Sequence, residues 1–69
     1  MRKYWYYTYQ TKSGTGYAVS YSDTGEFELF ERTKWISNHC KQQCIITNWK
    51  EISCTQYEKM REYFDNQNK

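Results

Sequence analysis

The chain has 69 residues, and ten lysines and arginines against eight aspartates and glutamates give it a net charge of +2. This length fits one domain, predicted to span residues 1–69, and the balanced charge excludes the strongly basic class of nucleic-acid-binding proteins. No stretch reaches the roughly 18 apolar residues of a membrane-spanning helix, so no membrane association is expected. Three tryptophans, eight tyrosines and three phenylalanines predict a folded core rather than a disordered chain.

The cysteines and the N-terminus bear on the compartment. Cys40, Cys44 and Cys54 cannot all pair within one molecule, which predicts free thiols in a reducing environment. The N-terminus lacks the apolar segment of a signal peptide, because Arg2 and Lys3 run directly into aromatic residues. Both observations predict a cytoplasmic protein.

The first predicted element is an aromatic strand. Residues 3–11 have high β-propensity throughout. Their alternation places Tyr4, Tyr6 and Thr8 on one face and Trp5, Tyr7 and Tyr9 on the other. Aromatic side chains on both faces are typical of a central strand. Turn-forming residues follow at 13–16 and residues 17–22 alternate again, which predicts a β-hairpin.

The next segment, residues 26–40, is open to two interpretations. Residues 26–31 alternate as a third strand would, but apolar residues also recur at helical spacing along the whole segment, and this length favours a helix. Asp23 followed by Glu26 matches a capping box at the start of that helix. His39 suits its C-terminal end, where the helix dipole favours a cation.

Residues 44–49 alternate as a further strand, which gives the element order β-β-α-β-α. A crossover through the first helix would carry this strand over the aromatic strand, so the predicted fold is a three-stranded antiparallel sheet with order 2-1-3. This is the α+β class. Both helices are expected on one face of the sheet, with the other face at least partly open.

The clearest local signal lies at the start of the last helix. Ser53 is an N-cap residue and Gln56 follows three positions later, the pattern of a capping box. A helix is therefore predicted from Cys54. The polar tail at residues 65–69 is expected to fray.

The chain resembles small uncharacterised bacterial proteins of ββαβα layout. The resemblance rests on the aromatic first strand, the glycine-containing turn, the phenylalanine that opens the middle helix, and the closing segment ITNWKEISCTQYE, residues 46–58. The shared features are fold determinants such as Trp49, Ile52 and Ser53. The resemblance therefore implies the fold and carries no activity, substrate, cofactor or functional residue to this chain.

A cysteine- or zinc-dependent activity is the third and least favoured function that the sequence suggests. His39, Cys40, Cys44 and Cys54 are the residue types of a zinc site. Cys44 and Cys54 would stand at opposite ends of a strand, some 20–30 Å apart at about 3.3 Å per residue, so no metal and no cofactor are predicted. A helix N-terminus favours a thiolate at Cys54, but His39 is the only histidine that could serve it as a base. No catalytic residue is predicted.

The predicted binding surface is the aromatic face of the sheet. It comprises Arg2, Lys3, Tyr4, Tyr6, Lys12, Ala18 and Ser20. Tyrosine and arginine are enriched in protein interfaces, and an open sheet can pair with an extended peptide or with its own copy. A non-enzymatic interaction module is therefore expected, with a protein partner or homo-oligomer and no small-molecule ligand.

The alternative function is binding of single-stranded nucleic acid. Bases stack on aromatic rings, and basic residues at the rim would contact phosphates. The segment GYAVSY, residues 16–21, is similar to the aromatic octapeptide of the RNA-recognition motif, but it lacks one aromatic position. Deleting one residue turns the remainder of a strand to the opposite face, which argues against that family.

Overall fold

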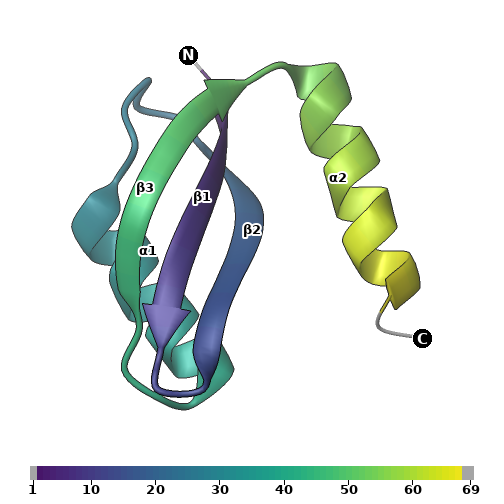
Figure 1. Ribbon diagram of the computed structural model, residues 1–69. Coiled ribbons are helices and arrows are strands. Elements are labelled where there is room, and N and C mark those ends of the chain that lie inside the picture. The colour runs from purple at the N-terminus through teal and green to yellow at the C-terminus, as the bar shows by residue number, and fades with distance from the viewer. Residues whose placement is uncertain (1, 68–69) are drawn as a thin grey trace.

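The computed structural model describes residues 2–67 and has the predicted element order β-β-α-β-α (Figure 1). The elements are β1 (Lys3–Thr11), β2 (Gly14–Ser22), α1 (Leu29–Cys40), β3 (Ile45–Ile52) and α2 (Cys54–Gln67). The three strands form one antiparallel sheet with the order β2-β1-β3. The predicted α+β class and the predicted sheet order are therefore confirmed.

The hairpin of β1 and β2 closes over a two-residue loop. The Thr11 hydroxyl donates to the Gly14 carbonyl at 3.1 Å and accepts the Ser13 N–H at 3.1 Å. Gly14 has a φ of 137°, which residues with a side chain rarely adopt, so glycine suits this position. The register then runs unbroken from Thr11–Gly14 to Lys3–Ser22.

The middle helix begins later than residue 26. It starts at Leu29, and its N-cap residue Glu28 makes no side-chain capping bond, so the predicted capping box of Asp23 and Glu26 does not form. Asp23 instead accepts a hydrogen bond from Arg2 at 2.9 Å. Phe27 explains the delay, because its ring packs against the sheet and holds the preceding residues in a loop. The strand interpretation of residues 26–31 is wrong.

The last strand and the last helix lie close to their predicted positions. β3 extends to Ile52, three residues beyond the predicted end. The capping box that starts α2 is confirmed, since the Gln56 N–H donates to Ser53 Oγ at 3.1 Å and the Ser53 N–H donates to Gln56 Oε1 at 3.4 Å. The tail predicted to fray is helical as far as Gln67, and residues 68–69 lie outside the described residues.

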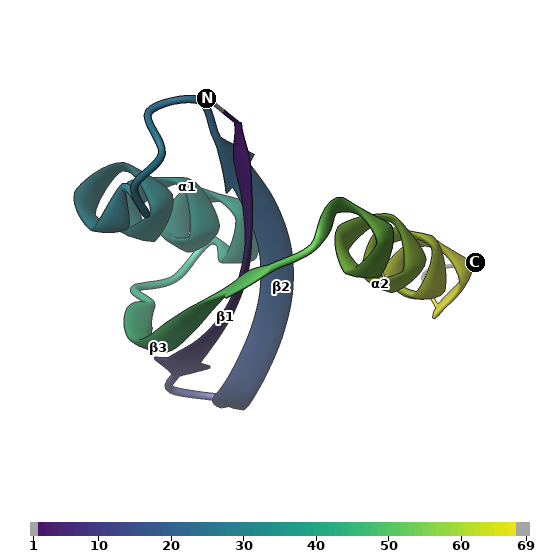
Figure 2. The same ribbon diagram turned by 90° about the horizontal axis from the view of Figure 1, so that it is seen from above.

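The prediction that both helices cover one face is wrong: α1 and α2 lie on opposite sides of the sheet (Figure 2). Ile36 of α1 joins Tyr7 in the core on one face. On the other face Tyr57 of α2 packs against Tyr4, with ring centroids 4.8 Å apart. The physical reason is that β1 carries aromatic rings on both faces, so each face needs its own helix to remove those rings from water.

The most buried side chains surround Tyr7 at the centre of the sheet. Tyr7 is 0% exposed, and Ile36 and Cys44 are almost as deeply buried. Within residues 2–67 the Tyr7 hydroxyl has no hydrogen-bond partner. Burial raises the pKa of Tyr7 to about 12, because the phenolate would lose its hydration, and Arg32 offsets only part of this effect.

Within the described chain, neither helix has the length and apolar character needed to cross a bilayer.

Gly16 is required by the Tyr9 ring that faces it across the hairpin. A Cβ at this position would lie 2.5 Å from the ring carbon Cζ of Tyr9. We expect Gly16→Ala to lower the free energy of unfolding by about 1–3 kcal/mol, because the ring must move out of its packed position. Urea denaturation measures the change, and the same substitution in a Tyr9→Val background is the control. An equal loss in both backgrounds would show that the ring is not the cause.

Candidate functional site

The structure divides the predicted binding surface between the two faces of the sheet. Directly paired residues on neighbouring strands share a face, and Ala18 is paired with Tyr7. Ser20, two residues further along β2, lies on that same face. Tyr4 and Tyr6 point to the opposite face, so the predicted set does not form one surface.

The face of Tyr4 and Tyr6 is also less open than expected. Tyr57 of α2 covers Tyr4, and the ring of Tyr6 lies 6.3 Å from that of Tyr17. Tyr17 in turn packs against Phe64 of α2 at 5.4 Å. The rings predicted as a binding platform are therefore largely engaged in packing under α2.

The predicted basic rim is divided and partly neutralised. Arg2 is paired with Asp23 at 2.9 Å, and Lys3 is paired with Glu51 at 3.6 Å. Lys12 lies in the loop at the other end of β1, about 30 Å away at 3.3 Å per residue. Arg2 lies over the ring of Tyr21, 4.4 Å from the ring centroid, but Lys12 is at the far end of the strand, so the three cations do not form one rim around Tyr4 and Tyr6.

The histidine and the three cysteines are also dispersed. Cys44 is buried in the core, Cys40 packs beside it, and Cys54 is exposed at the start of α2. No group of three or more metal-ligating side chains occurs among residues 2–67. Burial is the main cause that raises the pKa of the Cys44 thiol, which keeps this sulfur protonated.

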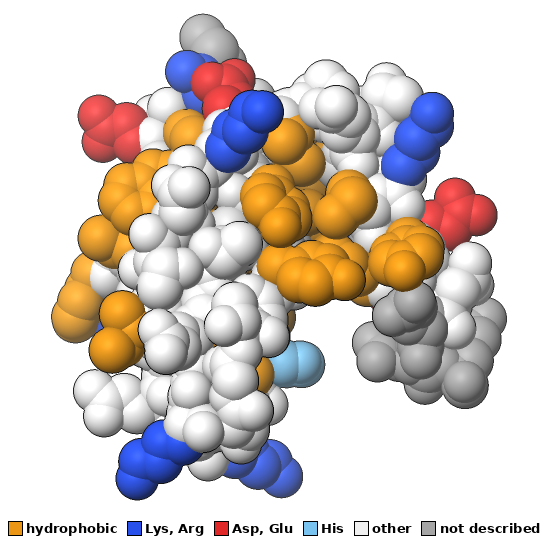
Figure 3. Space-filling view, viewed as in Figure 1, with side chains coloured by type: hydrophobic (Ala, Val, Ile, Leu, Met, Phe, Trp, Pro, Cys, Tyr) orange, Lys and Arg blue, Asp and Glu red, His pale blue; other side chains and the backbone are white. Residues whose placement is uncertain are grey.

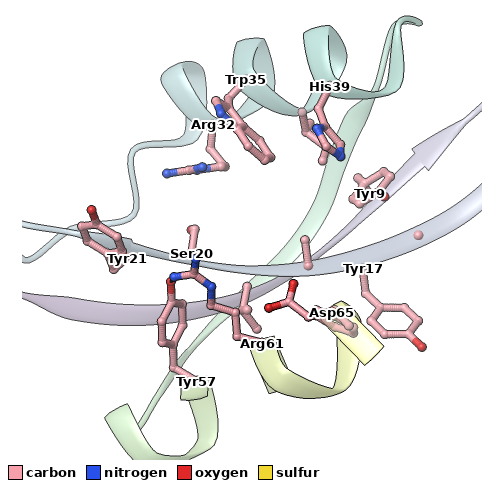
Figure 4. A pocket seen from close by; sticks show the side chains of 15 residues that line it. Tyr9, Tyr17, Ser20, Tyr21, Arg32, Trp35, His39, Tyr57, Arg61 and Asp65 are labelled. Atoms are coloured by element: carbon pink, nitrogen blue, oxygen red, sulfur yellow. The ribbon is translucent and has the colours of Figure 1, made fainter. Parts of the chain in front are cut away.

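A groove of about 670 Å³ lies along β2, and we call it the β2 groove. Its floor includes the six consecutive β2 residues 16–21, and both helices supply its walls (Figure 4). The wall residues are Arg32, Trp35, Ile36 and His39 from α1 and Tyr57, Arg61, Phe64 and Asp65 from α2. In the space-filling view, hydrophobic side chains gather where the sheet meets α2, and the single histidine lies at a hollow below them (Figure 3).

α2 runs along β2 in the direction opposite to the strand, whereas α1 crosses behind the sheet and ends near the start of β2 (Figure 1). On α2, Tyr57 packs against Tyr21 at 6.4 Å, and Phe64, two turns later, packs against Tyr17 at 5.4 Å. On α1, the last residue, Cys40, places its sulfur 4.0 Å from the hydroxyl of Tyr9. Since Tyr9 is the partner of Gly16 in the sheet, α1 ends where β2 begins. Side chains of both helices therefore line the groove.

The edge of β2 lacks the features that protect an edge strand. Residues 14–22 contain no charged residue and no proline, and the pairing with β1 has an unbroken register. The other edge, β3, carries Lys50 and Glu51 and has a register shift opposite Thr8 and Tyr9. Charges and bulges prevent an edge strand from pairing with another chain. Only β2 is open to such pairing by these criteria.

Two residues of the predicted binding surface, Ala18 and Ser20, line the β2 groove, but the groove itself and its other residues were not predicted from the sequence. A signal for them did exist, because the predicted strand order 2-1-3 already placed the uncharged second strand at an edge. The two helical walls could not be predicted in the same way. The expectation of both helices on one face would have left one side of β2 without a wall.

No protein-family model, curated protein or solved structure matches the chain.

Proposed function

We propose that the protein is a non-enzymatic interaction module that binds an extended segment of a partner protein as a fourth strand beside β2. The observation that carries this proposal is an uncharged edge strand with unbroken register, lying in a groove between two helices. In strand addition, main-chain hydrogen bonds supply affinity and alternate side chains supply specificity. The three free thiols support a reducing compartment such as the cytoplasm as its place of action.

The size of the groove supports a short segment as the occupant. Six residues of β2 form the floor, which corresponds to about 20 Å of strand. An added strand would place alternate side chains against α1 and α2. The apolar contacts available to them are Trp35 on one wall and the partly exposed Phe64 on the other.

The two walls favour a single strand over a second copy of this chain. A second copy pairing through its own β2 would bring its α1 and α2 against the helices already flanking the groove. A segment with no helices of its own meets no such obstacle. The occupant we propose is therefore an extended, proline-free stretch of another protein.

Trp35 provides the test of this proposal, because it is 50% exposed on the α1 wall. Peptides of ten residues would be selected from a displayed random library against the intact protein. We expect Trp35→Ala to weaken the selected peptides at least about tenfold, since buried aromatic anchors contribute about 2 kcal/mol or more. Phe30→Ala is the matched control, because Phe30 is 72% exposed on the same helix but does not line the groove. It should leave binding unchanged.

Hydrogen exchange then reports which edge the peptide occupies. Alternate N–H groups of an edge strand face away from the sheet, so an added strand should slow the exchange of alternate β2 amides and leave β3 amides unchanged. Protection at β3, equal loss of binding in the Trp35 and Phe30 variants, or a library that yields no binder would each contradict the proposal. Enrichment of nucleic acid over every peptide would favour the alternative function.

A further inference from the structure

The two ends of the β2 groove differ in charge. Arg61 donates a hydrogen bond from Nη1 to the hydroxyl of Tyr57 at 3.3 Å. Because Tyr57 packs against Tyr21, this contact directs Arg61 toward the Tyr21 end of the groove. Asp65, one turn after Arg61 on the same wall, follows Phe64, whose ring lies on Tyr17, so the negative charge of the α2 wall lies nearer the Tyr17 end (Figure 4).

The α1 wall has the same polarity. Arg32 lines the β2 groove and also a neighbouring cavity together with Ser22, which places it at the late end of β2. Its guanidinium carbon lies 5.3 Å from the ring centroid of Trp35. His39, two turns further along α1, lies toward the early end of β2, where Figure 4 shows it near Tyr9. The Tyr21 end therefore has one arginine on each wall.

Neither arginine is matched by a carboxylate. Among the described residues, Arg32 and Arg61 take part in no ion pair. Glu28 and Glu31 line the neighbouring cavity instead of this groove, and Glu31 is paired with Lys34 at 4.0 Å. Two cations that face one groove from opposite sides favour an anionic occupant.

We infer that the segment bound beside β2 carries two consecutive acidic residues, which pair with Arg32 and Arg61. This inference rests on the proposed function. Successive side chains of a strand point to opposite sides, so a carboxylate at one position would face α1 and the next would face α2. Arginine binds carboxylates with charge-assisted hydrogen bonds, which are stronger than those between neutral groups. A single acidic residue would reach only one of the two walls.

Three displayed peptide libraries test this inference against the intact protein. Each holds a fixed central pair, Glu-Glu, Gln-Gln or Lys-Lys, between random flanks, so that either strand direction can place the pair at the Tyr21 end. We expect the Glu-Glu library to yield binders at least about tenfold tighter than the Gln-Gln library, because hydrogen bonds to charged groups are the stronger ones. The Lys-Lys library should yield the weakest binders. The advantage of Glu-Glu should shrink as salt is added.

Arginine variants then assign the effect. Arg61→Gln and Arg32→Gln should each weaken the Glu-Glu binders about five- to tenfold and leave the Gln-Gln binders unchanged. Lys12→Gln is the matched control, since it also removes one positive charge but lies in the hairpin loop outside the groove. It should have no effect. Arg61 is exposed, so its variant should fold even if Arg32→Gln disturbs the packing near Tyr7.

The outcomes separate the two proposals. Equal binding of the Glu-Glu and Gln-Gln libraries, with β2 amides protected from exchange, would overturn the acidic pair and leave strand addition standing. If Lys12→Gln weakened the Glu-Glu binders as much as the two arginine variants do, the preference for acidic peptides would depend only on net charge. That result would also overturn the acidic pair. Binders in none of the three libraries would overturn strand addition itself.

Discussion

Replacing Tyr7 with alanine is expected to remove a third or more of the free energy of unfolding at 25 °C. Tyr7 is 0% exposed at the centre of the middle strand, and its ring packs against the rings of Tyr9 and Phe27. Truncating a buried aromatic residue to alanine costs about 3–5 kcal/mol. A domain of this size has a total stability of roughly 3–10 kcal/mol, at 0.05–0.15 kcal/mol per residue. Circular dichroism and urea denaturation would measure the loss directly.

The phenylalanine variant is the matched control, because it keeps the ring and removes only the hydroxyl. Within residues 2–67 that hydroxyl has no hydrogen-bond partner, and Arg32 offsets only part of the cost of burying it. Tyr7→Phe should therefore leave the free energy of unfolding unchanged or raise it by about 1 kcal/mol. A loss comparable to that of the alanine variant would show that the hydroxyl, and not the ring, holds the core together.

Alkaline pH is expected to destabilise the protein through the same residue. Burial raises the pKa of Tyr7 from its ordinary value of 10 to about 12, so above pH 10 the folded state keeps a proton that the unfolded state loses. The stabilising contribution is therefore fully present below pH 10 and is lost as the pH rises toward about 12. The pKa difference corresponds to about 2–3 kcal/mol at 1.36 kcal/mol per unit.

Urea denaturation of the wild type and Tyr7→Phe from about pH 9 to about pH 12 isolates this contribution. The wild type should lose stability more steeply, by up to about 1.4 kcal/mol per pH unit. A slope should remain in the variant, because burial also raises the pKa of Tyr9, and a contact with Cys54 raises that of Tyr4. Parallel curves for the two proteins would mean that Tyr7 ionises as readily in the folded state as in the unfolded chain.

Local chemistry was sufficient to predict most of the fold. The alternation of residues 3–11 placed the aromatic side chains on their correct faces, and Ser53 with Gln56 located the start of α2. These features depend on neighbours within a few residues, where strand alternation and helix capping act. The predicted start of α1 was three residues too early. Phe27 stacks on Trp49, which is distant in the sequence, and this contact outweighs the local helical pattern.

The sequence by itself determined the elements, their order and the uncharged character of β2. The tertiary structure alone decided that α1 and α2 cover opposite faces and so enclose the free edge of β2 between two walls. The physical reason is that one strand exposes aromatic surface on both sides, and the free energy gained by burying each side depends on contacts that join residues far apart in the chain. Arg32 and Arg61, which lie 29 positions apart in the sequence, line opposite walls of one groove for that reason alone.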